Sequence, residues 1–272
     1  MGNDAPIGVF DSGVGGLTVA REIMRQIPNE RIVYFGDTAR VPYGSKSKDT
    51  IIKYTRQIIR FLKTENVKAI VIACNTASAF ALETVKQEID IPIIGVVKPG
   101  AKTAVATTKN NKIGIIGTEG TINSGIYTEF IHRLNPEIEV VSKACPLFVP
   151  LVEEGFIHDE ITDAVAKRYL AAFEEEGIDS LILGCTHYPL LRSTIAKVMG
   201  ENVNLVNPAY ETAIELKHLL DDKHLANVAD IDSPSSMYRF YVSDAAEKFR
   251  NFANTILPYD IKTTKQVNID EY

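Results

Sequence analysis

The stretch AIVIACNTASAFALETV at residues 69–85 has a counterpart in SLILGCTHYPLLRSTI at residues 180–195. Each begins with an apolar run typical of a buried strand, passes through a small residue, a cysteine and a threonine, and ends in a helical pattern. Earlier strand ends repeat at a similar offset, because Asp11 corresponds to Gly117 and Asp37 to Ala144. The chain therefore contains an internal repeat of about 110 residues, which predicts two similar halves.

Short apolar runs alternate with longer amphipathic stretches throughout the chain, a rhythm typical of βα units. The expected strands are Ile7 to Phe10, Ile32 to Phe35, Ala69 to Ala73, Ile93 to Val97, Ile113 to Ile116, Val140 to Ser142 and Leu181 to Leu183. The expected helices are Leu17 to Gln26, Lys48 to Glu65, Ser78 to Gln87, Ile126 to Leu134, Asp159 to Glu176, Leu190 to Val198 and Tyr210 to Leu220. The strands lack polar alternation, which favours parallel sheets covered on both faces.

We therefore predict an α/β fold of two open parallel-sheet domains related by pseudo-symmetry, with the site in the cleft between them. The first domain is expected to comprise residues 1–98 plus 209–272, and the second residues 99–208. The crossovers are expected at Lys98 to Gly100 and at Asn207-Pro208, with the tail from Tyr210 returning to the first domain. Asp230 to Ser236 reads as an exposed loop.

Composition excludes several classes of protein. The chain has 272 residues, 45% of them hydrophobic, enough for a core and too many for a disordered chain. A formal charge of −6 disfavours nucleic acid as the main ligand. Apolar runs such as Ala69 to Cys74 are far shorter than the roughly 18 residues of a membrane span. Residues Met1 to Pro6 lack the basic and apolar regions of a signal peptide, so a cytoplasmic location is expected.

Three cysteines at wide spacings indicate neither a disulfide framework nor a zinc site. A lone cysteine is most often a small core hydrophobe, and Cys145 is given that interpretation. Cys74 and Cys185 differ, because each lies where a strand gives way to polar residues and a helix, and helix N-termini favour the thiolate. If only one of these cysteines were a catalytic nucleophile, the other, at the equivalent position, would have no explained role. Two opposed thiols suit inversion at a carbon, with one removing a proton and the other delivering one to the opposite face.

Neighbouring polar residues could assist these thiols. His187 lies two residues beyond Cys185, and Asp11 ends the first strand, where it could tune Cys74, pair with a substrate ammonium or simply cap a helix. The turn FDSGVGG at residues 10–16 does not match a dinucleotide motif, since Thr18 replaces the third glycine, and it does not match a Walker motif, since no GKS or GKT follows. Ser12 and backbone N–H groups of this turn could instead bind a carboxylate. Further neutral donors are Asn75, Thr76, Thr186 and the turn at residues 117–121.

No metal role is assigned, because His132, His158, His218 and His224 show no ligand spacing. No residue marks a pyridoxal phosphate lysine, so no cofactor is expected. The tail from Val228 onward offers no recognisable chemistry.

Four segments carry a family resemblance: FDSGVGGLT at 10–18, GDTARVPYG at 36–44, ACNTAS at 73–78 and GCTHYPLL at 184–191. Together with PLVEEG at 150–155 they closely resemble the glutamate racemases of the aspartate/glutamate racemase superfamily. The resemblance extends over essentially the whole chain.

The resemblance implies a cofactor-independent isomerase that interconverts L- and D-glutamate and supplies D-glutamate for peptidoglycan, and thus for cell-wall biogenesis and cell shape. It implies that Cys74 and Cys185 are the acid/base pair, with Cys74 acting on D-glutamate and Cys185 on L-glutamate. Asp11, His187 and a glutamate of PLVEEG, for which we choose Glu153 over Glu154, are implied to assist. The implied substrate-binding residues are Asp11, Ser12, Tyr43, Gly44, Asn75, Thr76, Thr118, Thr121, Thr186 and His187. A small-molecule substrate and a homodimer are also implied.

Other functions remain open from the sequence. A racemase of another acid, such as aspartate, or a one-thiol decarboxylase would use a similar cleft, although the second cysteine disfavours the decarboxylase. A non-catalytic amino-acid-binding protein or a gyrase-interacting protein is an alternative from another class. A binding protein would lose nothing but affinity when either cysteine is replaced by serine.

Overall fold

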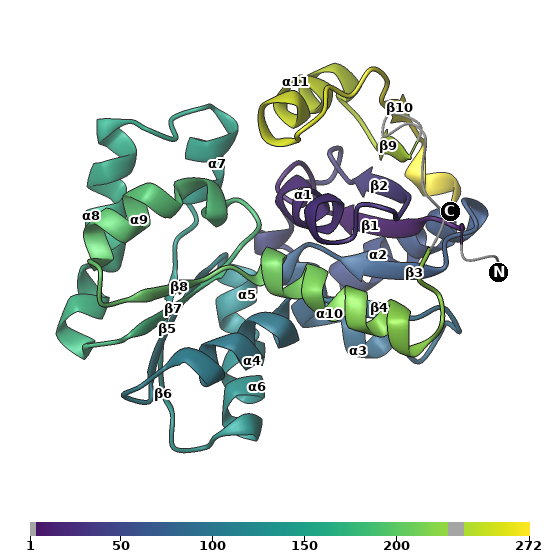
Figure 1. Ribbon diagram of the computed structural model, residues 1–272. Coiled ribbons are helices and arrows are strands. Elements are labelled where there is room, and N and C mark those ends of the chain that lie inside the picture. The colour runs from purple at the N-terminus through teal and green to yellow at the C-terminus, as the bar shows by residue number, and fades with distance from the viewer. Residues whose placement is uncertain (1–3, 228–236) are drawn as a thin grey trace.

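The computed structural model describes residues 4–227 and 237–272, and the loop expected at residues 230–236 lies outside this range. Its elements form two lobes, each built on its own sheet (Figure 1). The sheet of the first lobe has the strand order β10-β9-β2-β1-β3-β4, and the sheet of the second has the order β6-β5-β7-β8. All of these pairings are parallel. The prediction of two parallel-sheet α/β domains is therefore confirmed.

The strands are short and mostly buried. In the first lobe they are β1 Ile7–Asp11, β2 Ile32–Gly36, β3 Ala69–Ile72, β4 Ile93–Gly95, β9 Tyr238–Val242 and β10 Lys265–Gln266. In the second lobe they are β5 Lys112–Gly117, β6 Glu139–Ala144, β7 Ser180–Gly184 and β8 Asn204–Val206.

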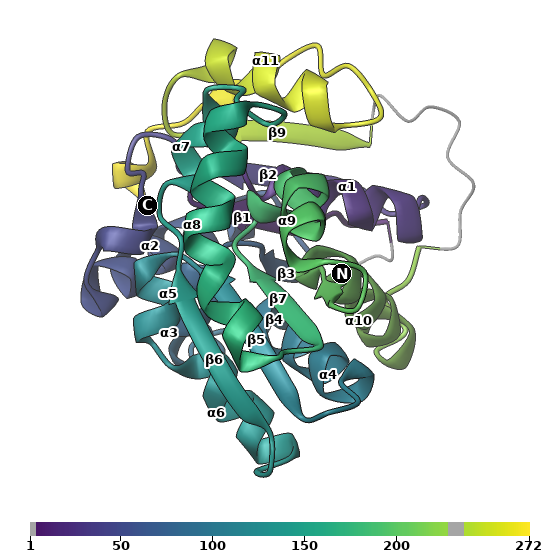
Figure 2. The ribbon, with the colours of Figure 1, turned by 90° about the vertical axis from the view of Figure 1, so that its left-hand side faces the viewer.

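The α-helices connect these strands and cover both faces of each sheet (Figures 1 and 2). They are α1 Leu17–Gln26, α2 Lys48–Thr64, α3 Asn75–Val85, α4 Val97–Thr107, α5 Glu119–Asn123, α6 Ile126–Leu134, α7 Phe148–Glu153, α8 Glu160–Glu176, α9 Arg192–Met199, α10 Pro208–Asp222 and α11 Ala246–Ile256. The 3₁₀ turns among the described residues are η1 Tyr43–Ser45, η2 Tyr188–Leu191 and η4 Ile269–Glu271.

Alternation along the central strands builds a core on each face of the first sheet. Ile7 and Val9 of β1 pack in one cluster with helices α1, α10 and α11, whereas Phe10 packs in another with α2 and α3. Successive strand side chains point to opposite faces, so a strand covered on both sides is apolar at every position. The second sheet is built the same way, with Leu181 of β7 on the side of α8 and α9 and Ile182 on the side of α4 and α6.

Several parts of the chain differ from the sequence-based expectation, which did not include α4, α5, α7 or β8. The segment Lys98 to Gly100, expected as a crossover, lies inside helix α4. Pro99 is tolerated there because it falls in the first helical turn, where a backbone N–H has no intrahelical partner. The tail returns to the first lobe as expected, and there it forms β9, β10 and α11, which the sequence pattern did not predict. Among the described residues, no helix combines the length and apolarity needed to cross a bilayer.

Close packing at the end of β7 generates a stability prediction. A Cβ atom at Gly184 would lie 2.6 Å from the backbone oxygen of Ile116 on β5, and a sheet cannot yield there as a flexible side chain would. We expect Gly184→Ala to lower the free energy of unfolding by about 1–3 kcal/mol in urea titrations. Ser180→Ala, at the other end of the same strand, is the matched control: the buried Ser180 hydroxyl has no hydrogen-bond partner, so stability should equal or exceed wild type. Equal stability of both variants would contradict this packing account.

Candidate active site

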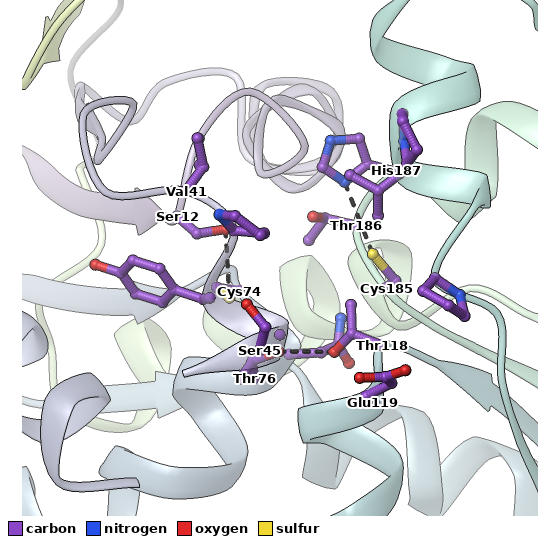
Figure 3. Close-up of a pocket in the computed structure, with 18 of the residues that line it drawn as sticks. Ser12, Val41, Ser45, Cys74, Thr76, Thr118, Glu119, Cys185, Thr186 and His187 are labelled. Atoms are coloured by element: carbon purple, nitrogen blue, oxygen red, sulfur yellow. Dashed lines mark hydrogen bonds between the residues drawn. The ribbon is translucent and has the colours of Figure 1, made fainter. Parts of the chain in front are cut away.

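A cavity of about 410 Å³ opens between the carboxyl ends of the two sheets, within the usual range for small-ligand sites. We call it the interlobe cavity. It is lined by Ser12, Gly13, Val41, Pro42, Tyr43, Gly44, Ser45, Cys74, Asn75, Thr76, Thr118, Glu119, Pro146, Val149, Pro150, Glu153, Cys185, Thr186 and His187. Figure 3 shows that the labelled residues of the first lobe face those of the second across the opening.

Cys74 stands on the first-lobe wall of the cavity. It follows β3 and is the N-cap of α3, where its sulfur accepts a hydrogen bond from the Ala77 N–H at 3.5 Å. The thiol in turn points to the Ser12 hydroxyl, with the two heavy atoms 3.7 Å apart. Burial, and secondarily the nearby Asp11 carboxylate, raises the pKa of the Cys74 thiol to about 12. The helix N-terminus was expected to favour the thiolate, but desolvation is the larger effect and favours the neutral thiol.

Cys185 stands on the opposite, second-lobe wall and is about as buried as Cys74, with exposed fractions of 6% and 5%. It follows β7, but no α-helix starts there, because the chain first forms the 3₁₀ turn η2. The Cys185 sulfur is 3.7 Å from His187 Nδ1. The structure therefore brings both cysteines to one cavity from equivalent strand ends, with a hydroxyl beside the first and an imidazole beside the second (Figure 3).

The imidazole of His187 lies between a thiol and a carboxylate. Its Nε2 atom is 2.9 Å from Glu153 Oε1 at the end of α7. Burial disfavours the imidazolium, but the contacts with Cys185 and Glu153 outweigh that cost and raise the pKa of His187 to about 10. Glu153 is desolvated too, yet the hydrogen bond from His187 holds the pKa of its carboxyl below the usual value. Glu154 faces away, toward Lys248 of α11.

Asp11 lies behind the cavity wall and is not part of its lining. Its carboxylate accepts hydrogen bonds from the Gly13 N–H at 2.9 Å and from the Thr186 hydroxyl at 3.4 Å. Burial raises the pKa of Asp11, and the charge of His187 opposes that rise. Asp11 therefore contacts groups of both lobes from behind the cavity wall.

The glycines of the turn after β1 allow the lobes to approach. A Cβ atom at Gly15 would come within 2.5 Å of the His187 ring and 2.3 Å of the Thr186 hydroxyl. Thr18, at the start of α1, donates a hydrogen bond to the Thr186 backbone oxygen at 2.9 Å. The sequence of this turn is similar to that of a nucleotide-binding loop, but its glycines instead make room for the second lobe.

Hydroxyl and amide groups join the lobes on the other side of the cavity. Thr76 of α3 is 2.9 Å from Thr118 and 3.2 Å from Thr121, measured between hydroxyl oxygens. The Tyr127 hydroxyl donates to the Asn75 side-chain oxygen at 2.7 Å. Thr118 lines the cavity, whereas Thr121 is buried behind it and supports Thr76 and Thr118.

Sequence reasoning missed some of the residues that line the cavity. They are Gly13, Val41, Pro42, Ser45, Glu119, Pro146, Val149 and Pro150. Four of these residues lie within or next to the quoted motifs, namely Gly13, Val41, Pro42 and Ser45. Their proximity to those motifs was the only sequence feature that could have indicated a place in the cavity wall. The tail also reaches the site, because Lys248 lies 3.7 Å from Glu154 and its charge helps to lower the pKa of Glu153.

The lining carries neither lysine nor arginine, so an anionic ligand would meet hydroxyls, amides, backbone N–H groups and His187. The first turn of α3, with free backbone N–H groups at Asn75 and Thr76, faces the cavity and favours a carboxylate. Among residues 4–227 and 237–272, no group of three or more His, Cys, Asp or Glu side chains is placed to hold a metal ion.

The contacts of His187 predict its titration. We expect the imidazole to remain protonated through neutral pH and to lose its proton near pH 10. In Glu153→Gln it should lose the proton at a lower pH, because that variant removes the carboxylate that contacts Nε2. Since the pKa is raised on folding, the stabilisation it brings is complete below the ordinary value of 6.5 and is lost as the pH rises toward 10. Imidazole NMR shifts, assigned with His187→Gln, measure the midpoint.

Glu154→Gln is the matched control for this titration, because Glu154 contacts Lys248 rather than His187. It should shift the His187 midpoint far less than Glu153→Gln does. Equal shifts in the two variants would show that Glu153 has no special relation to the imidazole.

Comparison with known proteins relates this site to a family. Residues 7–214 match the family model Asp/Glu/Hydantoin racemase. The chain is 47% identical to the glutamate racemase of Geobacter metallireducens, over 97% of each chain, and 47% identical to that of Oceanobacillus iheyensis, over 98% of this chain and 97% of the relative. The crystal structure of glutamate racemase from Francisella tularensis in complex with D-glutamate superposes with a TM-score of 0.91 at 44% identity, covering 99% of this chain and 100% of that one. The fold, the cavity and these matches agree, and the chain belongs to the Asp/Glu/Hydantoin racemase family.

Proposed function

We propose that this protein interconverts L- and D-glutamate, with Cys74 and Cys185 as the two bases. The observation that carries the proposal is the placement of both thiols on opposite walls of one cavity. Relatives at 47% identity are glutamate racemases, and the related Francisella tularensis enzyme binds D-glutamate. The dimensions of the cavity and its neutral donors suit a small amino acid with two carboxylates.

The reaction removes a proton from one face of Cα and delivers another to the opposite face. With L-glutamate bound, Cys185 as thiolate removes the Cα proton, and the Cys74 thiol delivers its own proton to the opposite face. With D-glutamate, Cys74 removes the proton and Cys185 delivers one. The cavity environment supports unequal starting states, because burial favours a neutral Cys74 while the imidazolium of His187 stands beside Cys185. Each turnover exchanges the protonation states of the two sulfurs and requires no redox change.

The carbanion formed between the two transfers carries charge on the α-carboxylate. Hydrogen-bond donors already fixed around that carboxylate stabilise the transition state more than they would in water. We assign this binding role to Ser12, Asn75, Thr76, Thr118, Thr186 and His187, which line the cavity. We assign Tyr43 and Gly44, which also line it, to binding the substrate in the ground state and the transition state alike. We assign Asp11 and Thr121 to the support of these groups, because both lie behind the wall.

The biological context follows from the same proposal. D-glutamate made by this protein would supply peptidoglycan synthesis and so support cell shape. The protein would act in the cytoplasm, as a homodimer and without an added cofactor.

We place the boundary between the lobes near residues 98 and 209. The strands of one sheet fall within residues 1–98 and 209–272, and those of the other within residues 99–208.

Activity without cofactor is the first prediction of this proposal. Purified protein is incubated with L-glutamate, without pyridoxal phosphate or added metal. The optical rotation due to glutamate should then fall to zero as the two enantiomers become equal in amount. Stable rotation from either enantiomer would exclude racemisation of glutamate and favour a protein that only binds its ligand. Aspartate, tested in parallel, separates the racemases of the two acids.

The three cysteines should respond differently to substitution. Cys74→Ser and Cys185→Ser are each expected to reduce racemisation by about 10²- to 10⁴-fold, because an alcohol is a far weaker general acid and base at neutral pH. Cys145→Ser is the matched control, since Cys145 is buried in the second-lobe core and does not line the cavity. Wild-type rates in either cavity variant would refute the assignment of two bases.

A further inference from the structure

The motif GDTARVPYG contains a buried ion pair that the substrate contacts do not explain. The Asp37 side chain is completely buried, and Arg40 Nε lies 2.7 Å from Asp37 Oδ2. The same carboxylate accepts hydrogen bonds from the Tyr43 hydroxyl and, at 2.9 Å, from the Ser243 hydroxyl of the tail. A buried carboxylate with this many donors has a fixed orientation, so it holds each donor in place.

Arg40 is itself fixed on three sides. Its guanidinium lies over the Tyr54 ring, 3.9 Å from the ring centre, and Nη1 donates to Gln57 Oε1 at 2.6 Å, both on α2. The carboxyl-terminal turn η4 approaches from the third side, with Asp270 Oδ1 3.6 Å from Nη1. The Arg40 side chain is 11% exposed and does not line the interlobe cavity. A planar group that stacks and donates in several directions cannot be replaced by a lysine ammonium.

The Tyr43 hydroxyl, which donates to Asp37, connects this ion pair to the wall of the cavity. Tyr43 is buried, and its ring packs on Tyr54 at 5.7 Å between centroids, while Tyr43, Gly44 and Ser45 all line the cavity. On the far side of this turn is the second lobe, because a Cβ atom at Gly44 would lie 2.8 Å from Thr118 Cβ. Asp37 and Arg40 therefore support the turn from behind, and the turn meets the opposite lobe in front.

We infer that Arg40 is a positioning residue for the reaction, which acts by orienting Asp37 and thereby fixing the Tyr43–Ser45 turn on the cavity wall. The turn η4 of the carboxyl terminus completes this support through Asp270. The inference rests on the proposed function, because its readout is racemisation. It assigns a role to residues that neither touch substrate nor transfer a proton.

The expected kinetic effect is specific. The turn forms part of the binding wall in the ground state and in the transition state alike, and loss of uniform binding raises KM with little change in kcat. Arg40→Lys keeps the charge but loses the stacking and the paired contacts. We expect it to raise KM about tenfold for both enantiomers, the effect of one lost charge-assisted hydrogen bond, with kcat within about threefold of wild type. Arg56→Lys, on the exposed face of the same helix α2, should leave both constants unchanged.

A double-mutant cycle tests whether Arg40 acts through Tyr43. Tyr43→Phe removes the hydroxyl that reaches Asp37, so it interrupts the same chain at its other end. The double variant should have a kcat/KM close to that of the more severe single variant. If the two losses instead multiply, or if Arg40→Lys lowers kcat and leaves KM unchanged, the positioning role is refuted.

Two further measurements keep the outcomes distinct. All kinetics are read at a temperature where circular dichroism shows every variant fully folded. If Arg40→Lys does not fold, Asp270→Asn replaces it, because the Asp270 side chain is 78% exposed and its loss leaves the Arg40–Asp37 pair intact. That variant should raise KM in the same direction by a smaller factor, and an unchanged KM would overturn the role of η4. Absence of racemisation in the wild type refutes the proposed function instead.

Discussion

The contact between the glycine turn after β1 and the Thr186-His187 segment is the constraint on which the site depends. Any side chain at Gly15 would occupy the space of the His187 ring, so the lobes can meet only because none is present. Asp11 and Thr18 then bind Thr186 from the first lobe. Because this contact adjoins Cys185, it fixes the distance between the second-lobe thiol and the first-lobe wall. Two separate sheets thus form one cavity between them.

Duplication gives the two cysteines equivalent places but not equivalent surroundings. Cys74 caps α3 and meets a hydroxyl near a buried carboxylate, whereas Cys185 meets an imidazole paired with Glu153. These neighbours stabilise different charge states, and burial strengthens the difference. An enzyme that works in both directions needs one thiol protonated and the other ionised at the start of each turnover. The asymmetry of the neighbours favours the starting state for L-glutamate, with Cys74 protonated and Cys185 beside an imidazolium, and one turnover leaves the opposite state from which D-glutamate reacts.

The sequence predicted the parallel sheets well, because their strands are apolar at consecutive positions and end in polar turns. It also located Cys74, Cys185 and His187 at strand ends that converge on one cavity. Tertiary effects explain what was missed. The pKa of Cys74 depends on its burial and on the nearby Asp11 carboxylate, which no local pattern reports. The tail had no motif, yet Ser243 contacts Asp37 and the charge of Lys248 acts on Glu153, because β9 and α11 pack beside elements from much earlier in the chain.

The central claim is that two different sulfurs act on opposite faces of Cα, and isotope placement at low conversion tests it most directly. L-Glutamate is incubated with the enzyme in D2O, and both enantiomers are isolated before a few per cent has reacted. The account predicts deuterium at Cα in essentially every molecule of D-glutamate and protium in the remaining L-glutamate, because the proton removed and the proton delivered reside on separate thiols. Deuterium in both enantiomers alike, or protium carried from substrate into product, would indicate a single base and contradict the account.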